Sequence, residues 1–386
     1  MSKTALAGTP GLASATEPHT TFSRSDLMIL AGSAVGIIIS AVTFYAGVNS
    51  VVAFICSAVG IAMLAALVGR CVERLGDRLG AGATGVLQSA LGNLPELFIS
   101  FFALRKGYLI VVQSAIIGSI LANLLLVLGL AFLVGGLKNG SQKFAVGRAR
   151  STCILMALAT AALVLPSLAS LTHSPAGQHE KALSVALAIV LLVIFGLSLP
   201  ASLRRNTEED AEGTEEVGYA VKSMGADDEV HHEGHWPIWL SVGMLAIAGV
   251  GAGLVSDWFV DALNPAIETL HISSVFAGLV IVAIAGNAVE NVVGIQLALR
   301  NKADYALSVI INSPLQIALV LAPLLVLLSF FTATTLTLVF SPLLIAAVVV
   351  SVLIVSLIVL DGESNWLEGS ILIGLYVMIA TLFWWG

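Results

Sequence analysis

Long apolar runs separated by short polar connections fill most of the chain. About eleven of the runs are long enough to cross a bilayer, because a membrane-spanning helix needs roughly 20 residues. Lipid offers the backbone no hydrogen-bond partners, so we expect each run to be helical. The expected spans are 27–48, 51–70, 82–104, 108–136, 148–168, 182–202, 236–260, 274–299, 305–331, 335–360 and 366–385. The pattern therefore predicts an all-α polytopic membrane protein with about 11 transmembrane helices.

Two stretches break this pattern because they are polar. Residues 1–26 contain Thr, Ser and Pro without an apolar run, which predicts a disordered N-terminus. Residues 203–235 are rich in Asp, Glu and His, which predicts a solvated acidic linker on the cytoplasmic side. A sharper alternative makes 206–235 a regulatory segment that binds calcium weakly, or zinc or nickel at its His-rich end. The spacing of an EF-hand loop is absent, so we expect no high-affinity calcium loop there.

Composition agrees with a membrane protein and removes other classes. Of 386 residues, 58% are hydrophobic and only 11% are charged, which is too apolar for a soluble domain of this size. The partner implied is the lipid bilayer, and the net charge of −7 gives no reason to expect nucleic acid. Cys56, Cys71 and Cys153 have neither metal nor disulfide spacing. Nothing in the sequence sets an oligomeric state.

The Lys and Arg residues predict the orientation in the membrane. With a cytoplasmic N-terminus, 14 of the 17 basic residues face the cytoplasm, and only Arg105, Lys106 and Lys181 lie outside. This asymmetry satisfies the positive-inside rule and predicts an outside C-terminus. The short N-terminus carries no evident targeting signal, which favours the plasma membrane, with a vacuole-like membrane as the alternative.

Two similar motifs place an acid inside apolar segments. Residues 92–96 read Gly-Asn-Leu-Pro-Glu and residues 286–290 read Gly-Asn-Ala-Val-Glu, an offset of 194 positions. The similarity continues without gaps from 92–136 against 286–330. An ionisable residue within a membrane is a functional-site hypothesis by default.

The repeat also predicts the domain organisation. In the predicted orientation, the segment carrying the first acid runs outward and the segment carrying the second runs inward. Inverted repeats of this kind are typical of secondary carriers. We therefore expect two inverted five-helix repeats, at 51–202 and 236–386, with 27–48 as an extra peripheral helix.

Polar residues recur with these acids at helical spacing. The candidate metal ligands are Glu96, Glu290, Asn93, Asn287, Gln316, Ser119 and Ser313. Carboxylate, amide and hydroxyl oxygens presented by four helices describe a site for a hard cation such as calcium, which takes six to eight oxygens. We also expect Gly92 with Pro95, and the stretch 312–314, to interrupt their helices and free backbone carbonyls.

Charge balance suggests how such a site is coupled. Two ionised glutamates at mid-membrane carry a large desolvation penalty when the site is empty. One divalent cation neutralises the pair, and so do two protons. Glu96 and Glu290 are therefore the predicted metal-binding and proton-coupling residues of a cation/proton antiporter that works by alternating access. We expect no cofactor, because calcium and protons are the transported substrates.

The candidate ligands also have simpler structural explanations, and the chain has alternative functions. Asn93 and Asn287 would act as hydrogen-bonding glue between helices, and Ser119 and Ser313 would allow close packing. An intramembrane hydrolase with paired acids is a further alternative, but every His lies outside the expected spans, so we expect no enzyme. A sensor whose active part is the linker is a third.

The two motifs resemble a known family. The first motif with residues 113–129, and the second with 311–319, resemble the two alpha-repeats of the cation/calcium exchanger superfamily, and most closely its calcium/proton exchanger branch. The resemblance implies exchange of cytosolic calcium for external or luminal protons. It also implies that Glu96 and Glu290 are the central ligands and proton carriers, assisted by Asn93, Asn287 and Gln316.

Individual positions separate this chain from neighbouring branches. Two features argue against sodium coupling. The sodium/calcium branch usually carries Thr-Ser or Ser before its acids, where this chain has Asn in both motifs. That branch also usually carries an Asp on the later helix of the second repeat, where this chain has Gln316. Ala122 stands where the calcium/proton branch often has Ser, and Asn291 where His is common. The alternatives are a sodium/calcium exchanger or a proton-coupled exchanger of another divalent cation such as manganese.

Overall fold

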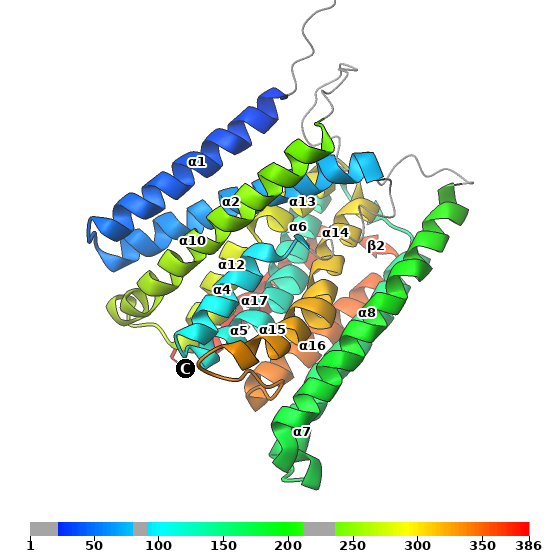
Figure 1. Cartoon of the computed structure of the whole chain (residues 1–386). Helices are drawn as coiled ribbons and strands as arrows, with labels where there is room; N and C mark the ends of the chain where they lie inside the picture. Colours follow the sequence, from blue (N-terminus) through cyan, green and yellow to red (C-terminus); the bar gives the residue numbers. More distant parts are fainter. Residues whose placement is uncertain (1–21, 80–90, 211–235, 386) are drawn as a thin grey trace, which may run out of the picture.

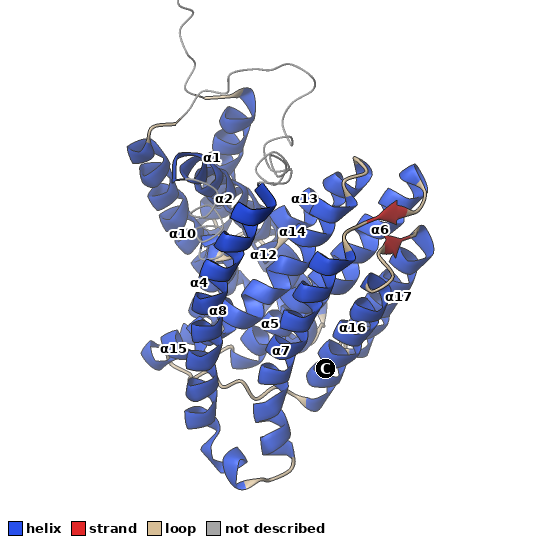
Figure 2. Ribbon diagram, turned by 90° about the vertical axis from the view of Figure 1, so that its right-hand side faces the viewer, coloured by secondary structure: helices blue, strands red, loops and turns tan. Residues whose placement is uncertain are grey.

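The computed structural model describes residues 22–79, 91–210 and 236–385, which are almost entirely helical (Figure 2). Within these ranges, 8 helices are long and apolar enough to cross a membrane, or up to 9 if one bent pair counts as a single span. A shorter apolar helix covers Trp366–Leu382. The predicted class, an all-helical polytopic membrane protein, is confirmed.

The described part before the acidic stretch contains helices joined by short turns. They are α1 (Arg24–Tyr45), α2 (Ser50–Leu79), α4 (Leu94–Arg105), α5 (Leu109–Leu121), the π-helical η1 (Ala122–Val127), α6 (Leu128–Asn139), α7 (Val146–Leu171), the 3-10 turn η2 (Pro175–His179) and α8 (Glu180–Asp210). The segments η1 and η2 lack α-helical hydrogen bonding, and η1 continues directly from α5 into α6.

The described part after the acidic stretch also consists mainly of helices joined by short connections. Its elements are α10 (Ile238–Leu270), α11 (Ser274–Phe276), the π-helical η4 (Ala277–Val282), α12 (Ala283–Gly286), α13 (Ala288–Leu299), α14 (Ala303–Gln316), the π-helical η5 (Ile317–Leu321), α15 (Ala322–Leu328), the 3-10 turn η6 (Ser329–Phe331), α16 (Pro342–Val359) and α17 (Trp366–Leu382). Two-residue strands β1 (Gln142–Lys143) and β2 (Glu363–Ser364) pair antiparallel and join the two parts.

The helices form one bundle with a distinct flank on each side. Helices α1, α2 and α10 pack together along one side, and α7 and α8 pair on the other (Figure 1). Glycines allow α1 to approach α2 closely, because a Cβ on Gly36 would lie 3.0 Å from the Cα of Gly60. These outer helices leave the centre of the bundle to the helices that carry the two motifs.

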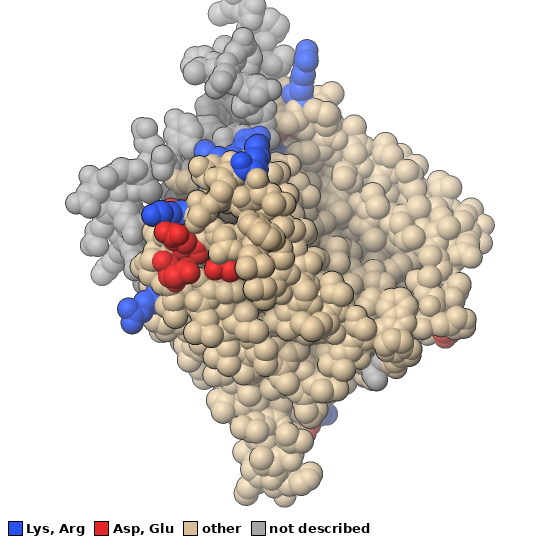
Figure 3. Space-filling model, turned by 180° about the vertical axis from the view of Figure 1, so that it is seen from behind, with Lys and Arg blue, Asp and Glu red and all other residues tan. Residues whose placement is uncertain are grey.

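The outer surface is apolar, as expected for a chain surrounded by lipid. On the face seen in Figure 3, large areas carry neither acidic nor basic side chains, and the charges gather mainly toward one end. Large hydrophobic side chains are exposed on the described part of the chain, among them Leu197 at 70%, Leu357 at 70% and Val250 at 67%. Such exposure fits hydrocarbon and not water.

One predicted helix starts later than expected. Residues 335–341, predicted as the beginning of a span over 335–360, are not helical, and α16 begins only at Pro342 with Ser341 as its cap. Pro is favoured at the first position of a helix, so it sets this boundary. The backbone of this stretch is held by side chains, since Leu338 N donates to Ser184 Oγ at 2.9 Å. Non-helical backbone at this depth is tolerated because it is buried in protein.

Two expected polar stretches are partly helical. The helix α1 begins at Arg24, inside the region predicted to be disordered, because Ser23 and Asp26 form a capping box. The helix α8 continues to Asp210, so the first residues of the expected linker 203–235 are helical. Residues 1–21 and 211–235 of these stretches, and residues 82–90 of the third expected span, lie outside the described residues.

Candidate cation site

Both motif acids lie in the first turn of a helix that begins after a break. Asn93 precedes α4 with φ −95° and ψ 25°, and Asn287 precedes α13 with φ −95° and ψ 20°. The helices Ser274–Gly286 and Glu290–Leu299 are bent by 65° relative to each other. The expected interruption beside Pro95 is confirmed, and the N-terminal end of each helix offers its dipole to the acid.

The two motifs meet at Gly286. Glu96 is only 6% exposed, and a Cβ on Gly286 would lie 2.7 Å from Glu96 Cγ and 3.2 Å from its Oε1. Only glycine at this position lets the first acid lie against the second motif. Glu290 follows four residues after Gly286, in the first turn of α13, so the first acid lies against the motif that carries the second. Neither oxygen of Glu96 has a hydrogen-bond partner among the described residues, whereas Glu290 is partly exposed.

A loose amide contact lies beside Glu96. Asn93 Nδ2 donates to Gln316 Oε1 at 3.5 Å, which joins the first motif to the end of α14. Asn93 is 7% exposed, and its Oδ1 has no hydrogen-bond partner in the described part of the chain. The predicted residues Glu96, Asn93 and Gln316 are therefore brought together, and the side-chain oxygens of Glu96 and Asn93 have no hydrogen-bond partner among the described residues. We call these three with Glu290 the open group.

A second set of predicted residues forms a closed network around Asn287. Its Nδ2 donates to Ser119 Oγ at 3.0 Å and to the carbonyl of Ala283 at 2.9 Å. Its Oδ1 accepts from Asn123 Nδ2 at 2.9 Å and from Ser313 Oγ at 3.2 Å. Every hydrogen-bonding position of the Asn287 amide is used. We call Asn287, Ser119, Ser313 and Asn123 the closed group.

Asn123 is not among the residues that the sequence predicts as ligands. It is completely buried and donates to the Ser119 carbonyl at 2.9 Å as well as to Asn287 and Ser313. Its position four residues after Ser119 puts both side chains on one helical face, which is the signal that could have identified it.

The helices distort at matching places beside these groups. The π-helical η1 begins at Ala122 and η5 begins at Ile317, one residue after the position that the 194-residue offset assigns to Ala122. Single π turns inside helices are frequent at functional sites. The expectation that 312–314 interrupts its helix is wrong, because α14 runs through Pro314 to Gln316. Pro314 lacks a backbone N–H donor, and the helix continues after it into the wider turns of η5 without a break.

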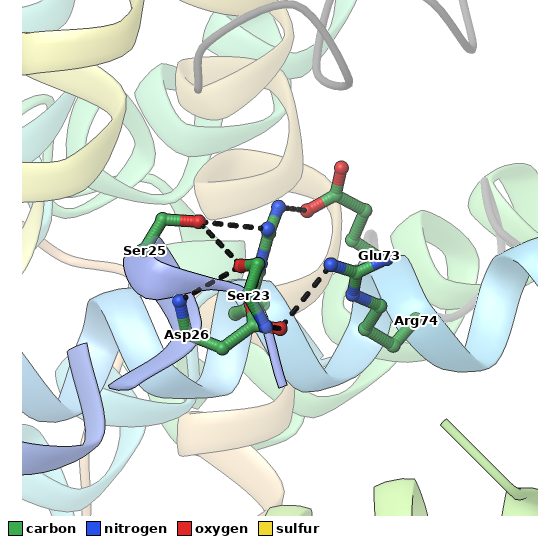
Figure 4. Close-up of polar contacts among 6 residues, drawn as sticks. Ser23, Ser25, Asp26, Glu73 and Arg74 are labelled. Carbon is green, nitrogen blue, oxygen red and sulfur yellow. Dashed lines mark hydrogen bonds and ion pairs between the residues drawn. The ribbon is translucent and has the colours of Figure 1, made fainter. Parts of the chain in front are cut away.

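Buried charges outside the site are a feature that the sequence analysis missed. Asp26 is 1% exposed and pairs with Arg70 Nε at 2.6 Å and with Arg74 at 3.3 Å (Figure 4). Arg70 also pairs with Glu73 at 2.8 Å. This cluster attaches α1 to α2. No signal in the sequence singles it out, because Asp26 lies in a polar stretch and the arginines match the positive-inside pattern.

An all-helical bundle with two acids at paired helix breaks is typical of ion carriers. The profile of the family described as sodium/calcium exchanger protein matches residues 49–203 and 240–385. The chain belongs to this family, as the resemblance of its motifs implies.

Relatives along most of the chain are named as calcium/proton antiporters. A "Ca(2+)/H(+) antiporter" of Aphanothece halophytica is 36% identical over 333 residues, which cover 86% of this chain and 89% of the relative. "Ca(2+)/H(+) antiporter ChaA" of Bacillus subtilis is 34% identical over 335 residues, covering 86% and 92%. The solved structure "native YfkE" superposes with a TM-score of 0.75 at 32% identity, covering 92% of this chain and 99% of that one.

Proposed function

We propose that this protein is a secondary antiporter that exchanges calcium for protons across its membrane by alternating access. Its family and the names of its relatives support this function, and no relative cited above is named as an enzyme. The observation that carries the site assignment is Glu96, whose buried carboxyl group lies against Gly286 of the second motif and has no hydrogen-bond partner among the described residues.

The open group is the part of the site that binds calcium directly. Glu96 and Glu290 supply carboxylate oxygens, and Asn93 and Gln316 supply amide oxygens. Calcium takes six to eight oxygens, so backbone carbonyls freed at the two breaks and water complete the shell. The closed group contributes shape, because the hydrogen bonds of Asn287, Ser119 and Ser313 fix the second break beside Glu290.

Neutralisation of the two acids couples the two ions. One calcium ion balances both carboxylates, and two protons do the same when calcium leaves. The empty, doubly charged site does not cross a closed, dry state because two uncompensated charges would be buried there. Each transport cycle therefore carries calcium in one direction and protons in the other.

The two parts of the chain act as inverted halves, with the N-terminus in the cytoplasm and the C-terminus outside. The same family profile matches each part once, which supports two related halves. The excess of basic residues on one side supports the orientation. The plasma membrane is the proposed location, and regulation by a cation at 206–235 remains a prediction on a segment of which 211–235 lie outside the described residues.

The test uses purified protein in proteoliposomes with acidic interiors. Calcium-45 uptake should follow the proton gradient, stop when the gradient is collapsed, and fall on the order of 100-fold in Glu96→Gln and in Glu290→Gln, because either change removes one charge of a buried pair. Correct folding of both variants is checked by size-exclusion elution. Uptake driven by a sodium gradient alone would overturn proton coupling.

A further inference from the structure

The C-terminal ends of the two acid-bearing helices are each held by a side chain from the other half of the chain. In α4, the Leu104 carbonyl accepts from Thr334 Oγ1 at 3.2 Å. In α13, the Ala298 carbonyl accepts from Gln142 Nε2 at 3.0 Å. Leu104 and Ala298 correspond at the 194-residue offset, so both carbonyls stand at the same distance along the chain from their acids.

The turns after these helices also correspond. Gly107 and Asn301, again at the 194-residue offset, both have positive φ, at 84° and 61°. Their backbone N–H groups donate to Leu104 and Ala298 at 3.1 Å and 3.0 Å. The two helix ends therefore have equivalent backbone geometry, and the side chains that hold them can be compared directly.

The two helix ends are held differently: buried amide side chains hold the end of α13, whereas at the end of α4 Lys106 pairs with Asp257 and Asp261 of α10 at 3.2 Å and 2.6 Å. Gln142 is 2% exposed, fits against Gly135, and donates to Asn301 Oδ1 at 2.9 Å as well as to Ala298. Asn139 Nδ2 adds a bond to the Ala298 carbonyl at 3.1 Å. At the matching end of α4, Thr334 contributes a single bond and is partly exposed.

The loop that carries Gln142 is itself anchored at other points. Its β1 strand pairs with β2, which places Gln142 opposite Ser364. The backbone N–H of Ala145 donates to Asp304 Oδ1 at 2.5 Å, in the first turn of α14. The loop therefore connects the end of α13, the start of α14 and the start of α17 in one fixed unit.

The other end of α13 is fixed as well. Asn287 precedes the helix, and its side chain makes three hydrogen bonds within the closed group and one to the Ala283 carbonyl. Asn93, at the corresponding place before α4, makes its one side-chain contact among the described residues at 3.5 Å. Helix α13 is thus held at both ends, and the acid in its first turn follows the position of the helix.

We propose that Gln142 is a positioning residue for Glu290, whose helix is held at both ends by residues of the first half of the chain. The inference rests on the proposed calcium/proton exchange. Gln142 touches neither ion. It acts by holding the C-terminal end of α13, so that a short stiff helix presents the Glu290 carboxyl group at one distance from Glu96.

The experiment measures exchange kinetics of Gln142→Met, which keeps the side-chain volume and removes the donors. We expect the KM for calcium to rise about five-fold, the equivalent of one buried hydrogen bond, with the maximal rate within two-fold of native and the pH of half-maximal exchange shifted. Thr334→Val, the matched variant on the other half, and Ser141→Ala, on the exposed side of the same loop, should both keep the native KM.

A second variant protects the test against a folding defect. Asn301→Gly keeps the left-handed backbone at an exposed turn and removes one acceptor of Gln142, so it should raise the KM in the same direction by a smaller factor. A purely structural role would lower yield and maximal rate but leave the KM and the pH profile native. The inference is overturned if Gln142→Met and Asn301→Gly both keep the native KM and pH profile. It is also overturned if Thr334→Val raises the KM as much as Gln142→Met does.

Failure of the inference about Gln142 can be distinguished from failure of the proposed function. If native protein exchanges calcium for protons and Glu290→Gln does not, the exchange assignment stands whatever Gln142 does. If native protein shows no proton-driven calcium uptake, the exchange assignment itself fails and the kinetics of the Gln142 variant have no meaning. The native and Glu290→Gln measurements are therefore made first.

Discussion

The two motif amides occupy equivalent backbone positions but very different surroundings. Asn93 and Asn287 have φ of −95° in both cases, with ψ of 25° and 20°. The Asn287 side chain makes four hydrogen bonds, whereas among the described residues Asn93 makes one side-chain hydrogen bond, at 3.5 Å. The two asparagines therefore have nearly the same backbone conformation, but hydrogen bonds fix the side chain of Asn287 and leave that of Asn93 more loosely held.

The difference arises where the repeats diverge by one position. At the 194-residue offset, the pair Ala122-Asn123 corresponds to Gln316-Ile317. Each half thus supplies one amide to the other half's motif, Asn123 to Asn287 and Gln316 to Asn93. The shift by one residue brings the first amide to 2.9 Å and leaves the second at 3.5 Å. Small asymmetry between repeats can separate a fixed part of a site from an adjustable part.

The strongest way to break the comparison is to separate the two motifs. Gly286→Ala places a methyl group against Glu96 Cγ and displaces the acid from the second motif. We expect calcium-45 exchange to fall about 100-fold, since a displacement of about 1 Å in a preorganised site has effects of this size. Gly249→Ala is the control, because a Cβ there meets nothing within 4 Å. Native exchange in Gly286→Ala would contradict the close approach of the motifs.

Removing the closed group should affect stability first. Asn287→Ala deletes four buried hydrogen bonds, and we expect the free energy of unfolding to drop by about 3 kcal/mol, with a fall of about 5 °C in the melting temperature. Thermal unfolding of detergent-purified protein measures this change. A melting temperature equal to that of the native protein would show that the closed group is not a rigid point.

Removing the open amide should affect function first. Asn93→Ala takes away one proposed calcium ligand and a weak contact, so we expect the KM for calcium to rise about ten-fold while the melting temperature stays within 2 °C of native, roughly the effect of losing one weak hydrogen bond. Initial rates of calcium-45 uptake and thermal unfolding are compared on the same preparation. A larger loss of stability than in Asn287→Ala would reverse the comparison between the two motifs.

The smallest expected effect concerns an exposed ion pair. Glu363 pairs with Lys143 at 3.2 Å, and the Lys143 ammonium, with the Ser141 hydroxyl, holds the pKa of the Glu363 carboxyl below its usual value. A lowered pKa in the folded state gives stability above the unfolded pKa that is lost as pH falls through the folded pKa.

Because the pair between β1 and β2 is fully exposed, we expect Glu363→Gln to change the melting temperature only slightly at neutral pH and not at all at acidic pH. Melting curves across a pH series measure this small difference. A difference that grows as pH falls would have the wrong sign for a carboxylate stabilised in its charged form.

The fold class and the two acids follow from local features of the sequence. Apolar runs of spanning length predict the helices, and the glycine and proline beside Glu96 predict the break before α4. The non-helical stretch at 335–341 is not predicted, because its backbone is satisfied by Ser167, Ser184 and Gln113 from distant helices. Length and hydropathy cannot distinguish such a buried non-helical segment from a helix.

The sequence by itself determined that this is a helical membrane protein with two repeated motifs, each carrying an acid where burial is costly unless the acid has a role. Only the tertiary structure decided that Asn287 is enclosed while Asn93 is open, that Asn123 belongs with the motif, and that Gln142 holds the helix of Glu290. The physical reason is that hydrophobicity and helix breaks act over neighbouring residues. Hydrogen-bond partners more than a hundred positions apart depend on how the helices pack.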